Sequence, residues 1–298
     1  MASKREEKIL KNARVLRAKE HKLHQPLRLT TLSQAEQFVQ DRGLVSVLGG
    51  NELPSIVSAF LGREWRPSGR GFSSWLEWWS LKVSGERLGR ALSKLERSKV
   101  VVPTRIFRRS KTLMSRQLWP SLTPIVRHFS EEASSDRTFS KLERSILELI
   151  GRIGPIRTDK LKDELNVHGK TDSGKFHLAL SKLESYALIV GSEDPQPERH
   201  LHANIWSHWK SFAPDTKRKP DISYIDAISQ LLEMTLDAAV LAPEKEVAKW
   251  FRWKQETLEA KEQLLNAGKI IQAENFLVTP RAGNQKVSGT LSGFGLHS

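Results

Sequence analysis

The stretch of sequence that decides the fold is residues 140–206, which read SKLERSILELIGRIGPIRTDKLKDELNVHGKTDSGKFHLALSKLESYALIVGSEDPQPERHLHANIW. The apolar residues that define one helical face at its start are Leu142, Ile146, Leu149 and Ile150. Gly154 and Pro155 interrupt that pattern, and Thr158 can cap a short second helix. After a polar loop over 169–174, apolar positions at helical spacing predict a third helix: Phe176, Leu180 and Leu183.

Two predicted strands, 188–190 and 201–206, then flank a turn at 194–197. Three short helices followed by a hairpin is the order of a winged helix-turn-helix, a DNA-binding module whose third helix enters a groove. An ordinary helical subdomain with a hairpin is the alternative interpretation of the same pattern.

Related patterns on both sides of this stretch predict tandem modules. We expect a mainly α fold with small β-hairpins, built from tandem winged helix-turn-helix modules. The expected segments are a basic N-terminal helix or arm over 1–30, a first winged-helix-like module over 31–130, the second module over 138–212, a third over 221–280, and a disordered tail over 281–298.

The charge of the chain points to a nucleic-acid partner. The 298 residues include 48 Lys and Arg against 34 Asp and Glu, a formal net charge of +14. Between positions 97 and 127 there are basic residues and no acid at all: Arg97, Lys99, Arg105, Arg108, Arg109, Lys111, Arg116 and Arg127. Binding to phosphates is the simplest reason to tolerate such self-repulsion.

Composition also excludes several classes of protein. The chain has no Cys, so disulfides and thiolate metal sites are excluded. No apolar run approaches the ~18 residues of a membrane span, and the N-terminus lacks the apolar core of a signal peptide. We expect a cytoplasmic, nucleoid-associated protein with no membrane contact and no small-molecule cofactor.

The predicted DNA contacts lie on one hairpin, one helix and a second hairpin. On the first hairpin and after it they are Arg105, Arg108, Arg109, Lys111 and Arg116. On or just before the third helix of residues 140–206 they are Lys170, Lys175, His177 and Lys182, and on the second hairpin they are Arg199 and His200. We expect Arg108, Arg109 and Lys111 to be exposed at a hairpin tip, so that changing all three to Ala weakens duplex binding and leaves stability nearly unchanged.

Motifs for other chemistry are weak or missing. His200 and His202 have strand spacing, but no carboxylate or Cys stands at ligand spacing, so we predict no metal site. No phosphate-binding loop, dinucleotide-binding or hydrolase motif is present. Glu52 stands beside the Gly49-Gly50 turn, where a carboxylate can act on water; a solvated acid is the alternative interpretation.

Two segments resemble the AlkZ superfamily of DNA glycosylases, and within it the AlkZ-related branch. They are 38–61 (FVQDRGLVSVLGGNELPSIVSAFL) and 105–124 (RIFRRSKTLMSRQLWPSLTP), and the resemblance extends over about 35–280. It implies tandem winged helices around a basic channel for duplex DNA, and base excision from alkylated or cross-linked DNA. Glycosylases of this superfamily carry a Gln-x-Gln or Gln-x-Asp motif that positions water; the equivalent positions here are Ser46 and Leu48, which look non-catalytic.

Three classes of function therefore remain. The first is a DNA-binding, repair-related protein, either an active glycosylase or one without catalysis. The second is a winged-helix transcriptional regulator, which normally needs a dimerisation surface. The third is an RNA-binding protein, although nothing resembles an RNA-recognition motif. Oligomeric state, lesion and DNA sequence are not specified by these patterns.

Overall fold

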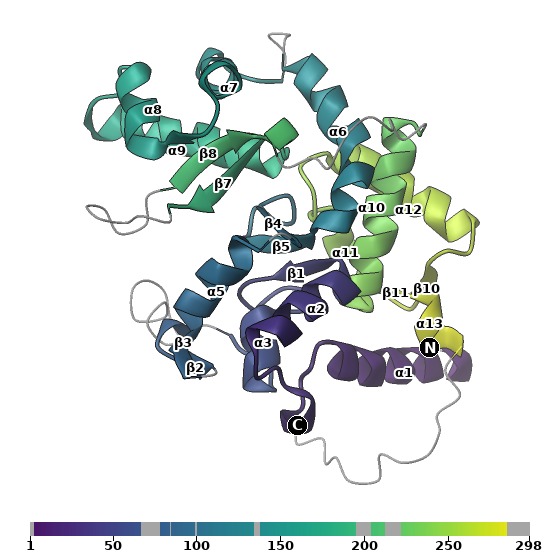
Figure 1. The fold of residues 1–298 in the computed structure, drawn as a ribbon. Coiled ribbons are helices and arrows are strands. Elements are labelled where there is room, and N and C mark those ends of the chain that lie inside the picture. Colours follow the sequence, from purple (N-terminus) through teal and green to yellow (C-terminus); the bar gives the residue numbers. More distant parts are fainter. Residues whose placement is uncertain are drawn as a thin grey trace.

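The computed structural model of this chain describes residues 3–66, 78–83, 85–98, 100–133, 138–194, 204–211 and 222–284. Within these ranges the chain is mainly helical, as predicted, and its strands form small antiparallel sheets (Figure 1). Three of these sheets have three strands each, and each belongs to one of three successive units of the chain.

The first unit comprises residues 32–115. Its elements are α2 (Leu32–Arg42), β1 (Leu44–Ser46), α3 (Ile56–Leu61), the two-stranded hairpin β2 (Lys82–Val83) and β3 (Glu86–Arg87), α5 (Leu88–Glu96), β4 (Val101–Thr104) and β5 (Thr112–Ser115). Strand β5 lies between β1 and β4, with Val45 opposite Leu113 and Val102 opposite Met114. Strand β5 therefore pairs with both β1 and β4 and forms the centre of this sheet.

The second unit comprises residues 141–208. Its elements are α7 (Lys141–Ile153), β6 (Ile156–Arg157), α8 (Thr158–Glu164), α9 (Gly169–Ser185), β7 (Ile189–Glu193) and β8 (Asn204–His208). The predicted first helix is confirmed, and Ser140 and Glu143 cap it reciprocally through a capping box. Strand β8 lies between β6 and β7, so the strand order matches that of the first unit.

The third unit comprises residues 224–278. Its elements are α10 (Tyr224–Ala239), β9 (Leu241–Pro243), α11 (Glu244–Val247), α12 (Lys254–Asn266), β10 (Ile271–Ala273) and β11 (Phe276–Val278). Strand β11 lies between β9 and β10. Apart from the β2–β3 hairpin between α3 and α5, all three units thus share one order: helix, strand, two helices and a hairpin whose second strand is central.

The first helix of each unit also ends in the same way. The residue after α2 is Gly43 with φ 75°, the residue after α7 is Gly154 with φ 91°, and the residue after α10 is Val240 with φ 67°. Glycine adopts positive φ without a steric penalty, whereas a β-branched side chain there is rare. The third unit keeps this sharp turn with a fully buried valine.

One hydrophobic core extends across the units. Helix α6 (Trp119–Glu132) links the first unit to the second and packs against α10. From α6, Phe129 contacts Tyr186 of the second unit and Trp253 of the third, with ring centroids 4.8 and 5.3 Å apart. The turn of the first hairpin joins this core through Phe107, whose ring lies 5.3 Å from that of Trp250. Within the described ranges, the three units are therefore packed together around a shared hydrophobic core.

Helix α1 (Lys4–Glu20) docks on the third unit. Its buried residues Leu10, Ala13 and Leu16 pack against Val240, Leu241, Ala273 and Val278. Helix α13 (Pro280–Asn284) closes the same cluster through Ala282. The expected tail was therefore placed to begin too early, because residues 281–284 complete a helix held by the ion pairs of Arg281 with Glu20 and Asp237.

Short 3₁₀ turns complete the described chain at Gln25–Leu27, Arg116–Leu118 and Trp209–Ser211. No helix in the described residues combines the length and the apolar run that crossing a membrane requires.

Candidate functional site

Helix α9 presents a solvent-exposed face with basic side chains. Phe176, Leu180 and Leu183 bury the inner face, as the sequence predicted. On the outer face, Lys170, Lys175 and His177 are exposed. Leu178 is 73% exposed, the largest exposed fraction of any large apolar side chain described. An apolar side chain among cations on an exposed helix suits contact with a base edge beside phosphates.

One of the predicted α9 contacts, Lys182, differs from its expected state. Lys182 is not free, because its Nζ donates to Glu143 at 2.9 Å and to the Thr138 carbonyl at 2.7 Å. It holds the start of α7 against α9. Burial and the nearby Lys162 lower the pKa of His177, which favours the neutral form of this side chain.

The first hairpin of the sequence analysis, formed by β4 and β5, differs further from what the sequence predicted. Its turn is docked against the third unit, with Phe107 fully buried and the Arg108 N–H donating to the Trp250 carbonyl at 2.7 Å. The Arg108 guanidinium bridges two carboxylates, with Nη2 2.6 Å from Glu52 Oε1 and 2.9 Å from Glu246 Oε2. The expectation that its charge is exposed and unpaired was wrong, because its acids come from positions far away in the sequence.

The flanking cations of this turn are also paired. Arg105 lies 2.9 Å from Glu184 Oε2, and Lys111 lies 2.6 Å from Glu96 Oε1. Both glutamates are buried where the first unit meets the second. Burial raises the pKa of Glu184 to about 7, and Arg105 opposes that rise. Folding therefore brings glutamates from outside the acid-free run of the sequence next to its cations.

The remaining predicted contacts fall into two groups. Arg109 is exposed at the turn with φ 55°, and Arg116 is partly exposed; within the described chain neither has a carboxylate within ion-pair distance. Arg199 and His200 lie outside the described residues.

A second basic helical face, on α5, was missed by the sequence analysis. Arg87, Arg90, Lys94 and Arg97 are all exposed, and their spacing of three and four places them on one face. Lys94 also contacts Glu86 at 2.9 Å. The signal was present in the sequence as the complement of the buried Leu88, Leu92 and Leu95. Helix α5 occupies the same place in the first unit that α9 occupies in the second.

The two positions equivalent to the glycosylase motif, Ser46 and Leu48, make contacts within the first unit. Ser46 is 1% exposed; its hydroxyl donates to the Leu48 carbonyl and accepts from Asn51 Nδ2 at 3.1 Å. Leu48 packs on the core of the first unit. Asn51 Oδ1 also accepts from the Leu53 N–H at 3.0 Å. These contacts shape the loop between β1 and α3.

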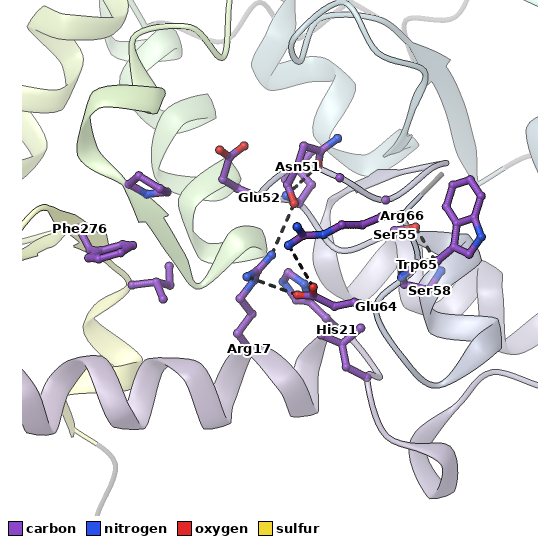
Figure 2. A pocket seen from close by; sticks show the side chains of 16 residues that line it. Arg17, His21, Asn51, Glu52, Ser55, Ser58, Glu64, Trp65, Arg66 and Phe276 are labelled. Carbon is purple, nitrogen blue, oxygen red and sulfur yellow. Dashed lines mark hydrogen bonds and ion pairs between the residues drawn. The ribbon is translucent and has the colours of Figure 1, made fainter. Parts of the chain in front are cut away.

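This loop forms one wall of a cleft of about 260 Å³. Figure 2 shows Arg17 entering it from α1, His21 from the residue after α1, Asn51 and Glu52 from the loop after β1, and Glu64 and Arg66 from the segment after α3. Glu52 is 13% exposed and its carboxylate is held by Arg108. Within the described residues no group of three or more His, Cys, Asp or Glu side chains is arranged to hold a metal ion.

A family model matches most of the sequence of this chain. No curated protein and no solved structure matches the chain at a significant level. The family model described as AlkZ related matches residues 29–252, from just before α2 to the turn before α12. That range contains all of the first and second units, and it links the chain to glycosylase-like proteins of DNA repair. The chain belongs to the AlkZ-related family.

Proposed function

We propose that this protein binds duplex DNA through the exposed basic faces of α5 and α9, as a repair-related member of its family. The observation that carries the proposal is the pair of cationic helix faces at equivalent positions of two successive units. Phosphate contacts by such side chains supply most of the sequence-independent affinity for DNA.

We further interpret the three units as winged helix-turn-helix modules. The order helix, strand, helix, helix, hairpin is that of the motif, and its third helix is the groove-reading element. Under this interpretation 31–130, 138–212 and 221–280 are the proposed modules. Figure 1 shows α5 and α9 on the same side of the drawing, with α12 on the other side beyond α10. The contact between α5 and β7 brings the first two modules together.

DNA recognition is better supported than base excision. A glycosylase must orient a water molecule toward the sugar. At the motif-equivalent positions, the Ser46 hydroxyl is hydrogen-bonded within the protein and the Leu48 side chain packs on the hydrophobic core. Family membership alone favours base excision as the second candidate function.

A salt titration tests the proposal. If about 6 phosphates are neutralised, the slope of log K against log salt concentration should be about −5 for duplex DNA. The α5 variant Arg87→Ala, Arg90→Ala, Arg97→Ala and the α9 variant Lys170→Ala, Lys175→Ala should each flatten that slope by about one unit per lost phosphate contact. Lys245→Ala with Lys254→Ala is the matched control, because both lysines are exposed on the third unit.

Three outcomes would contradict the proposal: a slope near zero, a control as weak as the helix variants, or tighter binding to structured RNA than to duplex DNA. The same protein incubated with alkylated or cross-linked duplex tests the second candidate, since excision releases free base and leaves abasic sites.

A further inference from the structure

The cleft of Figure 2 lies partly outside the family-matched range. The segments 49–55 and 64–66 that line it fall within residues 29–252, whereas Arg17 comes from α1, His21 from the residue after α1, and Phe276 from β11. Helix α1 thus adds a guanidinium to a cavity lined largely by the family-matched part of the chain.

Arg17 is a desolvated cation with poor protein partners. Its side chain is 26% exposed, and burial lowers its pKa. Its Nη2 lies 3.5 Å from the Asn51 carbonyl, its Nη1 lies 4.0 Å from Glu64, and its buried Nε has no hydrogen-bond partner among the described residues. These distances are at the outer limit of hydrogen bonds and ion pairs.

Other arginines of the described chain show what satisfied guanidinium groups look like. Arg108 has carboxylate oxygens at 2.6, 2.9 and 3.0 Å, and Arg281 has them at 2.7 Å on two different acids. A buried donor left unsatisfied is costly, so an acceptor from outside the chain that reached Arg17 would supply hydrogen bonds that Asn51 and Glu64 make poorly.

The other charges of the cleft favour an anion. Arg66 is 77% exposed and reaches into the cleft, where it contacts Glu64 at 3.4 Å (Figure 2). Glu52 and Glu246 share Arg108, and Lys249 also pairs with Glu246, so these two carboxylates are balanced by two cations. His21 is neutral, because burial lowers its pKa to about 3. Arg17 and Arg66 therefore outnumber Glu64, the carboxylate of the cleft lining that lies within ion-pair distance of both.

We propose that this cleft binds a phosphate group, with Arg17 as its principal ligand and Arg66 as its second. A guanidinium fork matches the oxygens of a phosphate. The volume of about 260 Å³ lies below the range of roughly 300–1,000 Å³ usual for sites of whole drug-sized ligands and suits a compact group. The phosphate comes from a free ion or nucleotide, or from a DNA strand; only the last source rests on the proposed function.

The test uses the full chain and calorimetric titration with three probes: inorganic phosphate, a deoxynucleoside 5′-monophosphate, and hairpin duplexes with a 5′-phosphate or a 5′-hydroxyl. Arg17→Gln should weaken the response to the first two probes about tenfold or more, since it removes charge-assisted hydrogen bonds. Arg66→Gln should weaken it less, because that side chain is more exposed. Glu64→Gln should tighten binding, because it removes the competing carboxylate.

Arg14→Gln is the matched control, an exposed arginine on the same helix, and it should leave phosphate affinity unchanged. A purely structural role for Arg17 would lower the melting temperature of Arg17→Gln without changing phosphate affinity, and that result overturns the proposal. Absence of phosphate binding to the wild type also overturns the proposal, and so does weaker phosphate binding by Glu64→Gln. The Glu64→Gln result does not depend on whether Arg17→Gln folds.

The probes separate this proposal from the previous one. Phosphate binding that is lost in Arg17→Gln, with no duplex binding at all, would refute the proposed function and leave the cleft intact. A preference for the 5′-phosphate hairpin that survives Lys170→Ala with Lys175→Ala would assign the strand end as the source.

Discussion

Helices α9 and α12 occupy the same place in two units of the same order, yet their surfaces differ. Helix α9 carries exposed Lys170 and Lys175 on its outer face. Helix α12 carries three glutamates, and its Lys261 is held at 2.8 Å by Glu244 and at 2.9 Å by Glu262. One arrangement of elements can therefore serve as a binding surface in one unit and as a support in another.

The contacts of the third unit explain its different surface. Its sheet receives α1, and the segment just before α12 receives Phe107 and Arg108 of the first hairpin. A unit that anchors two other parts of the chain has less free surface for a large ligand. The comparison predicts that charge changes act on DNA binding at α9 and leave it unchanged at α12.

The largest expected effect comes from reversing charge on α9. Lys170→Glu with Lys175→Glu should weaken duplex affinity about 100-fold at low salt, because two phosphate contacts become repulsive. Lys254→Glu on α12 should leave affinity within about twofold under the same conditions. Fluorescence anisotropy at several salt concentrations measures both. Equal losses in the two variants would erase the distinction between the helices.

Arg108 tests whether the first hairpin supports the fold. Arg108→Ala leaves Glu52 without its bidentate partner and should lower the free energy of unfolding by about 1–3 kcal/mol. Arg109→Ala, one residue away and exposed, should change it by less than about 0.5 kcal/mol. Denaturant unfolding gives both values. A stable Arg108→Ala protein with weakened DNA binding would instead return Arg108 to the DNA-binding surface.

His21 predicts a pH dependence located at α1 and the third unit. Its Nε2 contacts the Ala238 carbonyl at 3.0 Å, and burial lowers its pKa to about 3 from an ordinary value of 6.5. Between pH 6.5 and about pH 3, His21 therefore binds a proton in the unfolded chain but not in the folded chain. Stability should therefore fall as pH drops below 6.5, by up to about 1.4 kcal/mol for each pH unit until pH approaches 3.

His21→Gln should reduce this slope, since its side-chain amide can take the place of Nε2 and donate the same hydrogen bond without titrating. Thermal unfolding between pH 4 and 7 makes the measurement. An identical slope in the variant would assign the effect to another buried group such as His208, whose pKa burial lowers to about 4.

Gly174 gives the smallest expected effect and a sharp one. It lies inside α9, is exposed, and a Cβ built on it meets nothing within 4 Å. Gly174→Ala should therefore stabilise the protein by up to about 1 kcal/mol. If α9 enters a groove, the same methyl group should weaken DNA binding. Gly151→Ala on α7 is the control and should leave DNA affinity unchanged. A Gly174→Ala protein with full affinity would indicate that DNA approaches another face.

The sequence predicted what depends on neighbouring residues. The helical face formed by Leu142, Ile146, Leu149 and Ile150 correctly predicted α7. The hairpin that carries Arg105 to Lys111 was also predicted correctly. The sequence did not predict the partners of that hairpin, because Glu52 and Glu246 lie 56 and 138 residues from Arg108. The cleft was missed for the same reason, since Arg17 meets Asn51 only through the docking of α1.

The contact of α1 with α13 has a consequence for how the protein is made. Asn12 donates to the Ala282 carbonyl across 270 residues of sequence. During synthesis at roughly 5–20 residues per second, the apolar side of α1 must wait on the order of 15–50 s for the segment that covers it. Until then, the capping box stabilises the start of α1, and its exposed lysines and arginines keep its polar side in water. Helix α1 is thus synthesised well before the segment that completes its native contacts.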